Sequence, residues 1–383
     1  MKNSKNYHDE MNKENVLKLR RLMEELPEFC RQFFRGIEQT TSSRTRLAYA
    51  YDLGVFFEFL HRRNPALAKM EVTKFPLSVL DQVAKSDIEE YMEYLSYYQK
   101  EGNEYTNDER GKRRKLSSLR TLYNYFFKDE QIRTNPASLV LMPKLHDKEI
   151  VRLDPNEVAL LLDQAEDGSK MTKSQQKFHE KTKERDVAIL TLLLGTGIRV
   201  SECVGLDLED VDFDNLAIKV RRKGGYEDVV YFGEEVEAAL GAYLEQRIHI
   251  IPMEGHENAF FLSLQNRRMA VRSVENLVKK YASLVTTAKR ITPHKLRSTY
   301  GTTLYQETGD IYLVADVLGH RDVNTTHASG AGVRPRFPLL FARIPFLTVL
   351  AEIFFRPPAA GSVKRRFRSC IRRWIRSRMR RLT

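Results

Sequence analysis

A proline-containing stretch without hydrophobic periodicity interrupts the chain at residues 134–155, TNPASLVLMPKLHDKEIVRLDP. On both sides of it, apolar residues recur at the spacing of amphipathic helices. A run of this kind is typical of a linker between domains. A chain of 383 residues is long enough to bury two hydrophobic cores. The sequence therefore predicts two domains joined by this stretch.

The part of the chain before the linker reads as helical throughout. Residues 14–37 repeat apolar residues at helical spacing, and a Ser/Thr cluster starts a second segment with an aromatic face at residues 40–63. The third segment, residues 86–100, has Ser86 in the capping position and acidic residues in its first turn. The fourth, residues 112–132, is basic at its start and aromatic later. We predict leading helices at residues 1–40, a helical domain at 41–140 and the linker proper at 141–154.

The part after the linker mixes helices with one hairpin. Asp154 stands at a helix N-cap with Pro155 in the first turn. A strongly apolar helix at residues 183–197 is expected to stop at Gly195 and Gly197. Two β-rich runs around Gly224 and Gly225 predict an antiparallel hairpin at residues 216–233, and further helices are expected at 271–285, 292–309 and 310–319. The predicted fold class is mainly α with a small antiparallel β-sheet, and the second domain spans residues 155–327.

Three separated segments of the second domain supply cations suited to a phosphodiester. Arg199 follows a glycine turn and starts a helix on which Glu202, three residues later, can orient it. His294 and Arg297 share one face at the start of another helix. The hairpin tip adds Lys223, and the sequence LGH adds His320. Arg forks bind phosphate oxygens bidentately, and Lys and His can transfer protons. Because no carboxylate cluster accompanies these residues, we expect no metal and no other cofactor.

Each of these residues also has an ordinary structural interpretation. Arg199 and Glu202 have the spacing of a common helix ion pair. His294 alone is more often a helix-start histidine than a catalyst, and Lys223 beside two arginines could belong to a solvated hairpin. Only their joint order along the chain favours a common site.

That order resembles the successive motifs of the tyrosine site-specific recombinases, the phage-integrase and Xer family. The motifs are TGIRVSECVGLDLEDVD, VRRKGG, TPHKLRSTYGTTLY and VLGHRDVNTT, within a resemblance that covers roughly residues 40–326. The N-terminal helices resemble the core-binding domain of the family. The charged insert DGSKMTKSQQKFHEKTKERDVAIL is similar to that of the single-recombinase type named XerS.

The resemblance implies cutting and rejoining of double-stranded DNA without metal or ATP, through a 3′-phosphotyrosyl link and in a tetramer of protomers. It implies that Arg199 and Arg297 clamp the phosphate and that Lys223 protonates the 5′ leaving oxygen. His294 would act in acid–base catalysis, and His320 would donate a supporting hydrogen bond. Chromosome dimer resolution is one role that the resemblance allows.

The nucleophile of this family is expected nine or ten residues after the LGH histidine. Those positions hold Ser329 and Gly330, and no Tyr follows Tyr312. The composition also changes here: residues 331–383 contain thirteen Arg, one Lys and one acid, and no Asn, Gln, Asp, His or Tyr. We interpret residues 328–383 as translation out of frame and expect the chain to be inactive as written.

The basic tail also accounts for the net charge of +12, because residues 1–330 hold 49 basic and 50 acidic side chains. DNA binding must therefore come from local clusters. The cluster KRRK at the start of one predicted helix and two arginines before another are our candidates for phosphate contacts: Lys112, Arg113, Arg114, Lys115, Arg44 and Arg46.

Three other interpretations remain at this point. The chain could be a DNA-binding protein that recognises a site without cutting it, or a nicking enzyme like a type IB topoisomerase, which would need the same tyrosine. The apolar stretch at residues 337–355 has nearly the length of a membrane span, but Arg343, Glu352 and two prolines interrupt it. Because the N-terminus also lacks the apolar core of a secretion signal, we expect a cytoplasmic protein and no membrane function.

Overall fold

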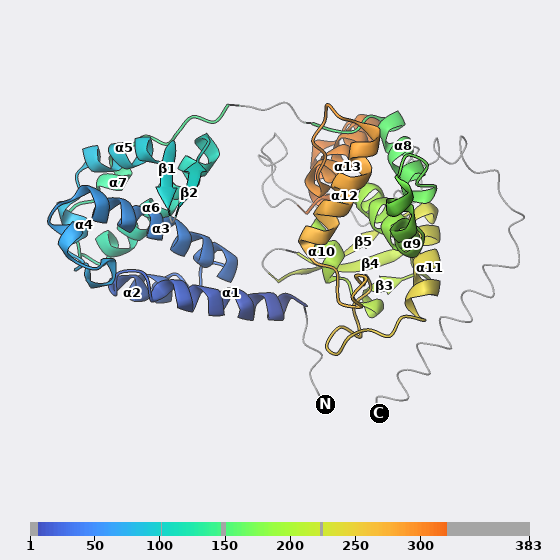
Figure 1. Ribbon diagram of the computed structural model, residues 1–383, viewed down its shortest axis with the longest axis horizontal. Helices are drawn as coiled ribbons and strands as arrows, with labels where there is room; N and C mark the ends of the chain where they lie inside the picture. Colours follow the sequence, from blue (N-terminus) through green and yellow to red (C-terminus); the bar gives the residue numbers. More distant parts are fainter. Residues whose placement is uncertain (1–6, 101, 147–150, 223–224, 320–383) are drawn as a thin grey trace, which may run out of the picture. The chain divides into compact units, whose positions relative to one another are not determined.

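The computed structural model describes residues 7–100, 102–146, 151–222 and 225–319, which form two compact units divided after residue 149 (Figure 1). Helices predominate in both, and each unit holds one small antiparallel sheet. The prediction of a mainly helical, two-domain chain with a small antiparallel sheet is confirmed. Within these ranges no helix is long and apolar enough to cross a membrane. The apolar stretch at 337–355 and the rest of the Arg-rich tail lie outside the described residues.

The N-terminal unit surrounds an aromatic core with helices. Its elements are α1 (Tyr7–Met23), α2 (Phe29–Gly36), α3 (Ser43–Arg63), the 3-10 turns Leu67–Lys69 and Val72–Lys74, α4 (Val79–Gln82), α5 (Lys85–Tyr94), β1 (Tyr97–Lys100), β2 (Asn103–Thr106), α6 (Glu109–Lys128) and α7 (Pro136–Leu139).

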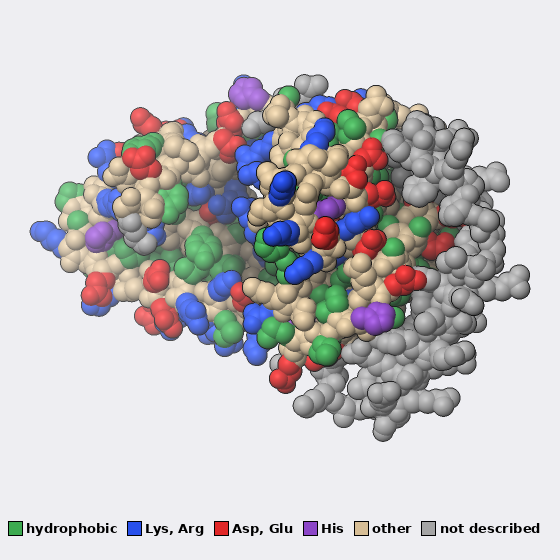
Figure 2. All heavy atoms as spheres, turned by 45° about the vertical axis from the view of Figure 1, so that its right-hand side comes forward, with side chains coloured by type: hydrophobic (Ala, Val, Ile, Leu, Met, Phe, Trp, Pro, Cys, Tyr) green, Lys and Arg blue, Asp and Glu red, His purple; other side chains and the backbone are tan. Residues whose placement is uncertain are grey.

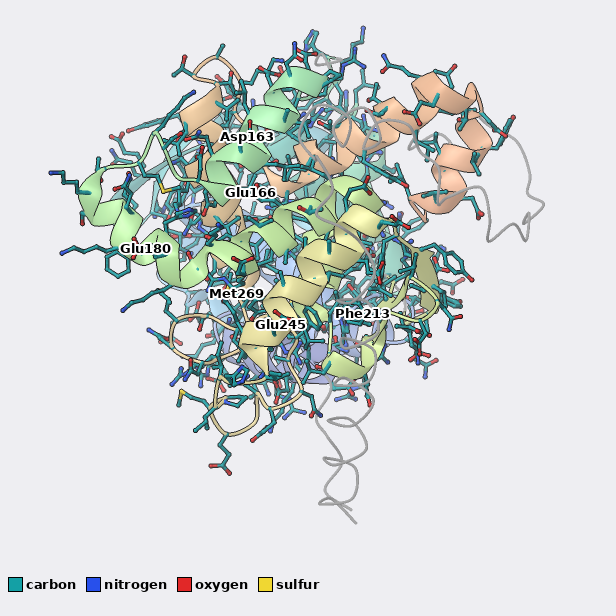
Figure 3. All side chains as sticks on the ribbon, turned by 90° about the vertical axis from the view of Figure 1, so that its right-hand side faces the viewer. Asp163, Glu166, Glu180, Phe213, Glu245 and Met269 are labelled. Carbon is teal, nitrogen blue, oxygen red and sulfur yellow. The ribbon has the colours of Figure 1, made fainter. Side chains whose placement is uncertain are left out.

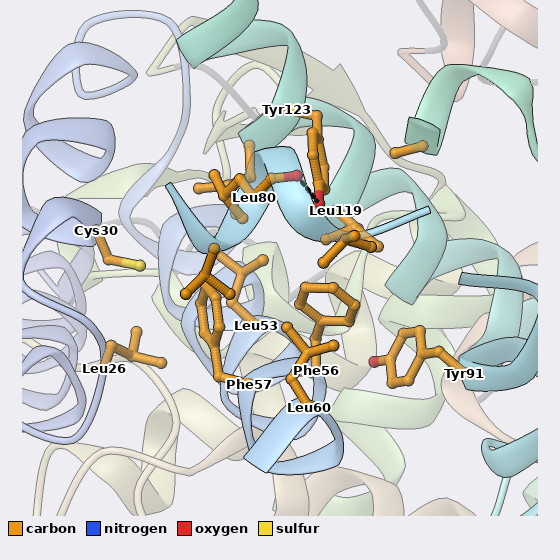
Figure 4. Packing of buried hydrophobic residues seen from close by; sticks show 14 of the residues in the cluster. Leu26, Cys30, Leu53, Phe56, Phe57, Leu60, Leu80, Tyr91, Leu119 and Tyr123 are labelled. Carbon is orange, nitrogen blue, oxygen red and sulfur yellow. Dashed lines mark hydrogen bonds between the residues drawn. The ribbon is translucent and has the colours of Figure 1, made fainter. Parts of the chain in front are cut away.

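The core of this unit forms where α3 and α6 pack against each other (Figure 4). Phe56 and Phe57 of α3 are fully buried, together with Leu119 and Tyr123 of α6. The Tyr123 hydroxyl donates to the Leu80 carbonyl at 3.1 Å, so the one polar atom of this ring is satisfied inside the core. Burying each large apolar side chain stabilises the unit by about 1.5–3 kcal/mol. The aromatic face predicted for residues 40–63 is thus the side of α3 that holds the unit together.

The third predicted helix of this unit is shorter than expected. It ends at Tyr94, and residues 97–100 instead form β1, which pairs antiparallel with β2. Ser86 is not the cap: the helix begins at Lys85, and Asp87 accepts a 2.8 Å hydrogen bond from the Ala84 backbone N–H. The all-helical expectation for this part of the chain is therefore wrong at the β1–β2 hairpin.

The C-terminal unit builds helices around a three-stranded antiparallel sheet with the order β3–β4–β5. Its elements are α8 (Pro155–Glu166), α9 (Lys173–Thr196), α10 (Val200–Gly205), the 3-10 turn Leu208–Asp210, β3 (Val211–Asp212), β4 (Ala217–Arg221), β5 (Glu227–Tyr231), α11 (Glu234–Arg247), α12 (Val271–Val285), α13 (Pro293–Thr308) and α14 (Ile311–Val317). The predicted hairpin is present, with Ala217 opposite Tyr231 and Arg221 opposite Glu227.

The long helix α9 lies at the centre of this unit and packs on α11 and α13. Gly195 does not stop it, because the helix continues to Thr196. The stop is Gly197, whose positive φ of 61° and N–H bond to the Leu193 carbonyl form the C-cap. A Cβ at Gly197 would lie 2.4 Å from the Tyr300 ring of α13, so this position needs glycine for space as well as for conformation.

The charged insert of the sequence forms the beginning of α9 and the turn before it. Its inner side is tied to α12 through Asp186, which is 2% exposed and accepts hydrogen bonds from Tyr281 at 2.9 Å and from Arg185 at 2.7 Å. Its outer side carries charges of both signs, because Lys173, Lys177, Glu180 and Lys181 are exposed. Figure 3 shows Glu180 on α9, with Asp163 and Glu166 on α8. Burial of a paired carboxylate on one side and exposure of charged side chains on the other indicate which face of the helix meets the core.

Candidate functional site

Arg199 is placed by the turn that follows α9. It is the N-cap residue of α10, directly after the Gly197 cap. The Glu202 carboxylate accepts from the Arg199 backbone N–H and from its Nη1, each at 2.8 Å. Glu202 is buried, whereas a third of the Arg199 side chain is exposed. The carboxylate therefore binds the guanidinium from its buried side and leaves part of it open to a ligand.

Arg297 and His294 lie near the N-terminal end of α13, which begins at Pro293 as expected. Arg297 is buried, and its Nη1 donates to the Gly197 carbonyl at 2.5 Å. Burial, followed by repulsion from Arg199, lowers the pKa of Arg297 to about 10, so the guanidinium remains charged at neutral pH. His294 is exposed at its helix surface, and loss of hydration together with the nearby Arg297 lowers its pKa below the ordinary 6.5.

The C-terminal end of α14 closes the site. Three successive backbone carbonyls there each accept from a different arginine: Val317 from Arg222 at 3.2 Å, Leu318 from Arg297, and Gly319 from Arg199 at 3.3 Å. Carbonyls at a helix C-terminus are unpaired within the helix and carry partial negative charge, which suits cations. The structure thus brings all four motifs of the sequence together at one place: the first three supply the arginines, and the fourth supplies the carbonyls.

The structure brings together Arg199, His294 and Arg297, three of the five predicted catalytic residues. Lys223 and His320 lie outside the described residues, as do the positions Ser329 and Gly330 where the nucleophile was expected. Their described neighbours, Arg222 and Gly319, contact the site directly.

Arg222 is the residue at this site that sequence reasoning missed. The sequence suggested it only as a neighbour of Lys223 in the alternative of a solvated hairpin, yet its side chain is 9% exposed and pairs with Glu202 at 3.1 Å. A usable signal was present: Ile218 and Val220 are buried, and Arg222 continues their alternation along the strand.

Two of the residues predicted to contact DNA in the N-terminal unit are buried. Lys115 is buried and donates to Asn107 at 3.0 Å, and Arg46 is buried and pairs with Glu38 at 2.6 Å. For Lys115 the physical reason is helical periodicity, which turns it to the same side of α6 as the core residues Leu119 and Leu122. These two residues are corrections to the predicted contact set.

The other four candidates remain accessible to different degrees. Arg44 and Arg113 are exposed. Arg114 is also exposed but pairs with the buried Asp52 at 2.7 Å, and Lys112 donates to Ser96 at 2.6 Å.

The expected contact between phosphate and the start of α6 also changes. The helix begins at Glu109, before KRRK, and Asp108 accepts from the Gly111 N–H at 2.9 Å. The side chain of Asp108 therefore satisfies a backbone donor that was expected to meet phosphate.

Two further surface properties bear on ligands. Figure 2 shows both Lys and Arg and Asp and Glu side chains on the visible face. Within the described ranges, no group of three or more His, Cys, Asp or Glu side chains is placed to hold a metal ion.

Comparisons with known proteins identify the family. Residues 151–329 match the model described as the phage integrase family. Tyrosine recombinase XerC of Caldanaerobacter subterraneus subsp. tengcongensis is 33% identical over 312 residues, which are 79% of this chain and 81% of that protein. The chain belongs to the tyrosine recombinase family. Tyrosine recombinase XerS of Lactococcus lactis subsp. cremoris (strain SK11) is 29% identical over 337 residues, covering 82% of this chain and 93% of the relative.

Solved structures of tyrosine recombinases share the fold. The Tn1549 transposon integrase in complex with circular intermediate DNA matches with a TM-score of 0.55 and 24% identity, over 85% of this chain and 98% of that one. XerH bound to its difH substrate matches with a TM-score of 0.53 and 18% identity, over 83% and 81% of the two chains. The two-domain recombinase architecture predicted from the motifs is thus confirmed.

Proposed function

We propose that this chain binds duplex DNA as a tyrosine recombinase does, gripping a backbone phosphate with Arg199 and Arg297, but does not cut it. The observation that carries the proposal is the convergence of both guanidiniums on the turn at Gly197 and the end of α14. Two arginines from different helices, one buried and one partly open, form a fork for the non-bridging oxygens of a phosphodiester.

The remaining residues would carry the proton transfers of strand cleavage. His294 is mostly neutral at pH 7 because its pKa is lowered, so it can accept or relay a proton near the phosphate. Lys223 would protonate the 5′ oxygen as it leaves, and His320 would donate to the phosphate. These two roles follow from the family motifs, in which Lys223 and His320 occupy the matching positions.

Cleavage fails in this proposal because the nucleophile is missing. Ser329 and Gly330 occupy the expected positions, and a serine hydroxyl is a far weaker acid than the phenol of tyrosine, with its pKa near 10. Arginines that hold the phosphate equally in the ground state and in the transition state contribute to binding but not to kcat.

The composition of the tail supports a displaced reading frame as the origin of this loss. The family match ends at residue 329, and the change to Arg-rich sequence falls at the same place. In the intact frame, the same site would exchange DNA strands as a tetramer, with chromosome dimer resolution as the proposed role. Reading the other frames of the gene after codon 326 tests this point: a continuation with a suitably placed Tyr supports it, and its absence contradicts it.

Binding is tested by measuring the Kd for duplex DNA against salt concentration, with a chain shortened to end at Thr326 beside the full chain. Phosphate contacts release counterions, so the shortened chain should bind with an affinity that falls steeply as salt rises. Arg297→Gln should weaken binding about tenfold, as expected for loss of a charge-assisted hydrogen bond. Binding that is independent of salt, or unchanged in Arg297→Gln, would contradict the proposed grip.

A further inference from the structure

Arg222 joins three elements around the proposed phosphate grip. Its Nη1 donates to Glu202 of α10 at 3.1 Å, its Nε to Asp228 of β5 at 3.1 Å, and its Nη2 to the Val317 carbonyl of α14 at 3.2 Å. The backbone of Arg222 is fixed as well, because its N–H donates to the Tyr226 carbonyl at 2.7 Å. A residue with this many directed bonds has little freedom to move.

Glu202 is therefore shared between two arginines. Its Oε1 accepts from Arg199 at 2.8 Å and its Oε2 accepts from Arg222 at 3.1 Å, and only 2% of its side chain is exposed. A buried carboxylate needs compensating charge and hydrogen bonds, and it takes them from whatever cation is near. With Arg222 in place, Glu202 divides its two oxygens between two guanidiniums, and the more exposed Asp228 supplies a second carboxylate to Arg222. Glu202 therefore does not neutralise Arg199 alone.

We propose that Arg222 is a positioning residue that, by sharing Glu202, keeps Arg199 oriented and free to bind a DNA phosphate. The inference rests on the proposed role of Arg199. Without Arg222, Glu202 would hold Arg199 alone, and the guanidinium would be drawn toward the buried carboxylate and away from the ligand. The proposal gives Arg222 no contact with the phosphate: its Nε and both Nη atoms hold Asp228, Glu202 and the Val317 carbonyl.

The packing around Gly319 supports a fixed position for Arg222. Gly319 has a φ of +60°, and a Cβ at this residue would lie 2.9 Å from Nε of Arg222. The guanidinium thus lies directly against the backbone that offers its Gly319 carbonyl to Arg199. The turn at Gly319 therefore fixes the positions of both Arg199 and Arg222.

A double-mutant cycle on the full chain tests the inference. The Kd for a fluorescent duplex is measured at several salt concentrations for the natural chain, Arg199→Gln, Arg222→Gln and the double variant. Lys219→Gln is the matched control, since it removes one charge from the strand that leads to Arg222, at a residue whose ion pair is with the exposed Glu227. All five proteins carry the same basic tail, whose contribution falls as salt rises, so the ratios of Kd are compared at the higher salt concentrations.

We expect Arg199→Gln and Arg222→Gln each to raise Kd about tenfold, and the double variant to be no weaker than either single one. Lys219→Gln should change Kd less than twofold, in keeping with an exposed pair. An additive cycle, with a double variant weaker by about a hundredfold, would overturn the inference, because Arg222 would then act independently of Arg199.

The two proposals fail in different ways. If Arg199→Gln binds as tightly as the natural chain, the phosphate grip is wrong and the inference falls with it. If Arg199→Gln weakens binding and Arg222→Gln does not, the inference alone is overturned. Should Arg222→Gln lose its thermal unfolding transition, Arg222→Lys replaces it in the cycle. A single ammonium cannot reach all three acceptors, so a several-fold rise in Kd that is non-additive with Arg199→Gln is again expected.

Discussion

His294 and Arg297 share the first turns of α13, and their surroundings are strongly positive. Loss of hydration, then Arg297, Lys295 and Arg199, all lower the pKa of His294. The unfolded chain therefore binds a proton at His294 more readily than the folded one. This contribution to stability is full above about pH 6.5 and is lost as the pH falls from there through the folded-state pKa.

A bound phosphate raises the pKa of His294, because its negative charge favours the protonated imidazole. We predict that the affinity for duplex DNA increases as the pH falls from about 8 to about 6, by less than about tenfold if the pKa rises by up to one unit. His294→Gln should flatten this dependence. The measurement is fluorescence anisotropy at constant ionic strength, and identical pH profiles for the two proteins would exclude His294 from the site.

At the scale of elements, α6 combines a structural side with a surface side. Asp52 of α3 is buried and accepts from Ser118 at 2.8 Å and from Arg114 at 2.7 Å, with the buried Lys115 at 3.7 Å. Arg113, on the same helix, is exposed. The KRRK cluster therefore divides into residues that hold α6 on α3 and residues that are open to DNA.

This division predicts that substituting Lys115 lowers the stability of the fold, whereas substituting Arg113 weakens DNA binding. Lys115→Ala leaves Asp52 with one cation fewer and should lower the free energy of unfolding by about 1–3 kcal/mol. Arg113→Ala should leave stability unchanged, weaken DNA binding and reduce the salt slope by about one. Chemical denaturation and salt-dependent Kd values distinguish the two. A stable Lys115→Ala, or an Arg113→Ala with the natural salt slope, would contradict this assignment.

How far the elements follow from sequence depended on local signals. The sequence predicted a Ser/Thr cluster at the start of α3, Pro155 at the start of α8 and the β4–β5 hairpin, because capping and turn residues act within a few positions. The β1–β2 hairpin was missed because Tyr and Gln at residues 97–99 fit a helix continuing from α5. Its stability depends on partners across the turn, such as the stacked rings of Tyr98 and Tyr105.

The residues of the candidate site also divide into those that the sequence predicts and those that depend on tertiary packing. Arg199, His294 and Arg297 were predicted because family motifs mark them, and the structure brings them together. The role of Glu202 as the partner of Arg199 followed from helical spacing. The contact of Arg222 with Val317, 95 residues away, depends on tertiary packing that spacing alone does not reveal.

At the scale of the whole molecule, charge is distributed very unevenly. Residues 1–330 are nearly neutral, whereas residues 331–383 carry fourteen basic side chains and one acid. A tail of this charge is expected to bind duplex DNA without sequence preference. The full chain should therefore bind any duplex more tightly at low salt than the chain ending at Thr326, and this difference should disappear as salt rises.

The central claim concerns what the assembled site can do without tyrosine. Tyr312, the last tyrosine of the sequence, lies on α14, one helix before the turn that meets the arginines. Reaching the phosphate would require this segment to fold back on itself. The site as it stands is expected to hold DNA and to leave it intact.

The most direct test is covalent trapping on a nicked duplex. The DNA region that the full chain protects from nuclease is first mapped, and duplexes nicked at successive positions across it are then incubated with the protein. In an active tyrosine recombinase the nick releases the leaving strand and traps the phosphotyrosyl link. For this chain we predict non-covalent binding on a native gel and no protein–DNA adduct on a denaturing gel, at every nick position. A covalent adduct, mapped by peptide mass spectrometry to Ser329, Tyr312 or any other residue, would contradict the account.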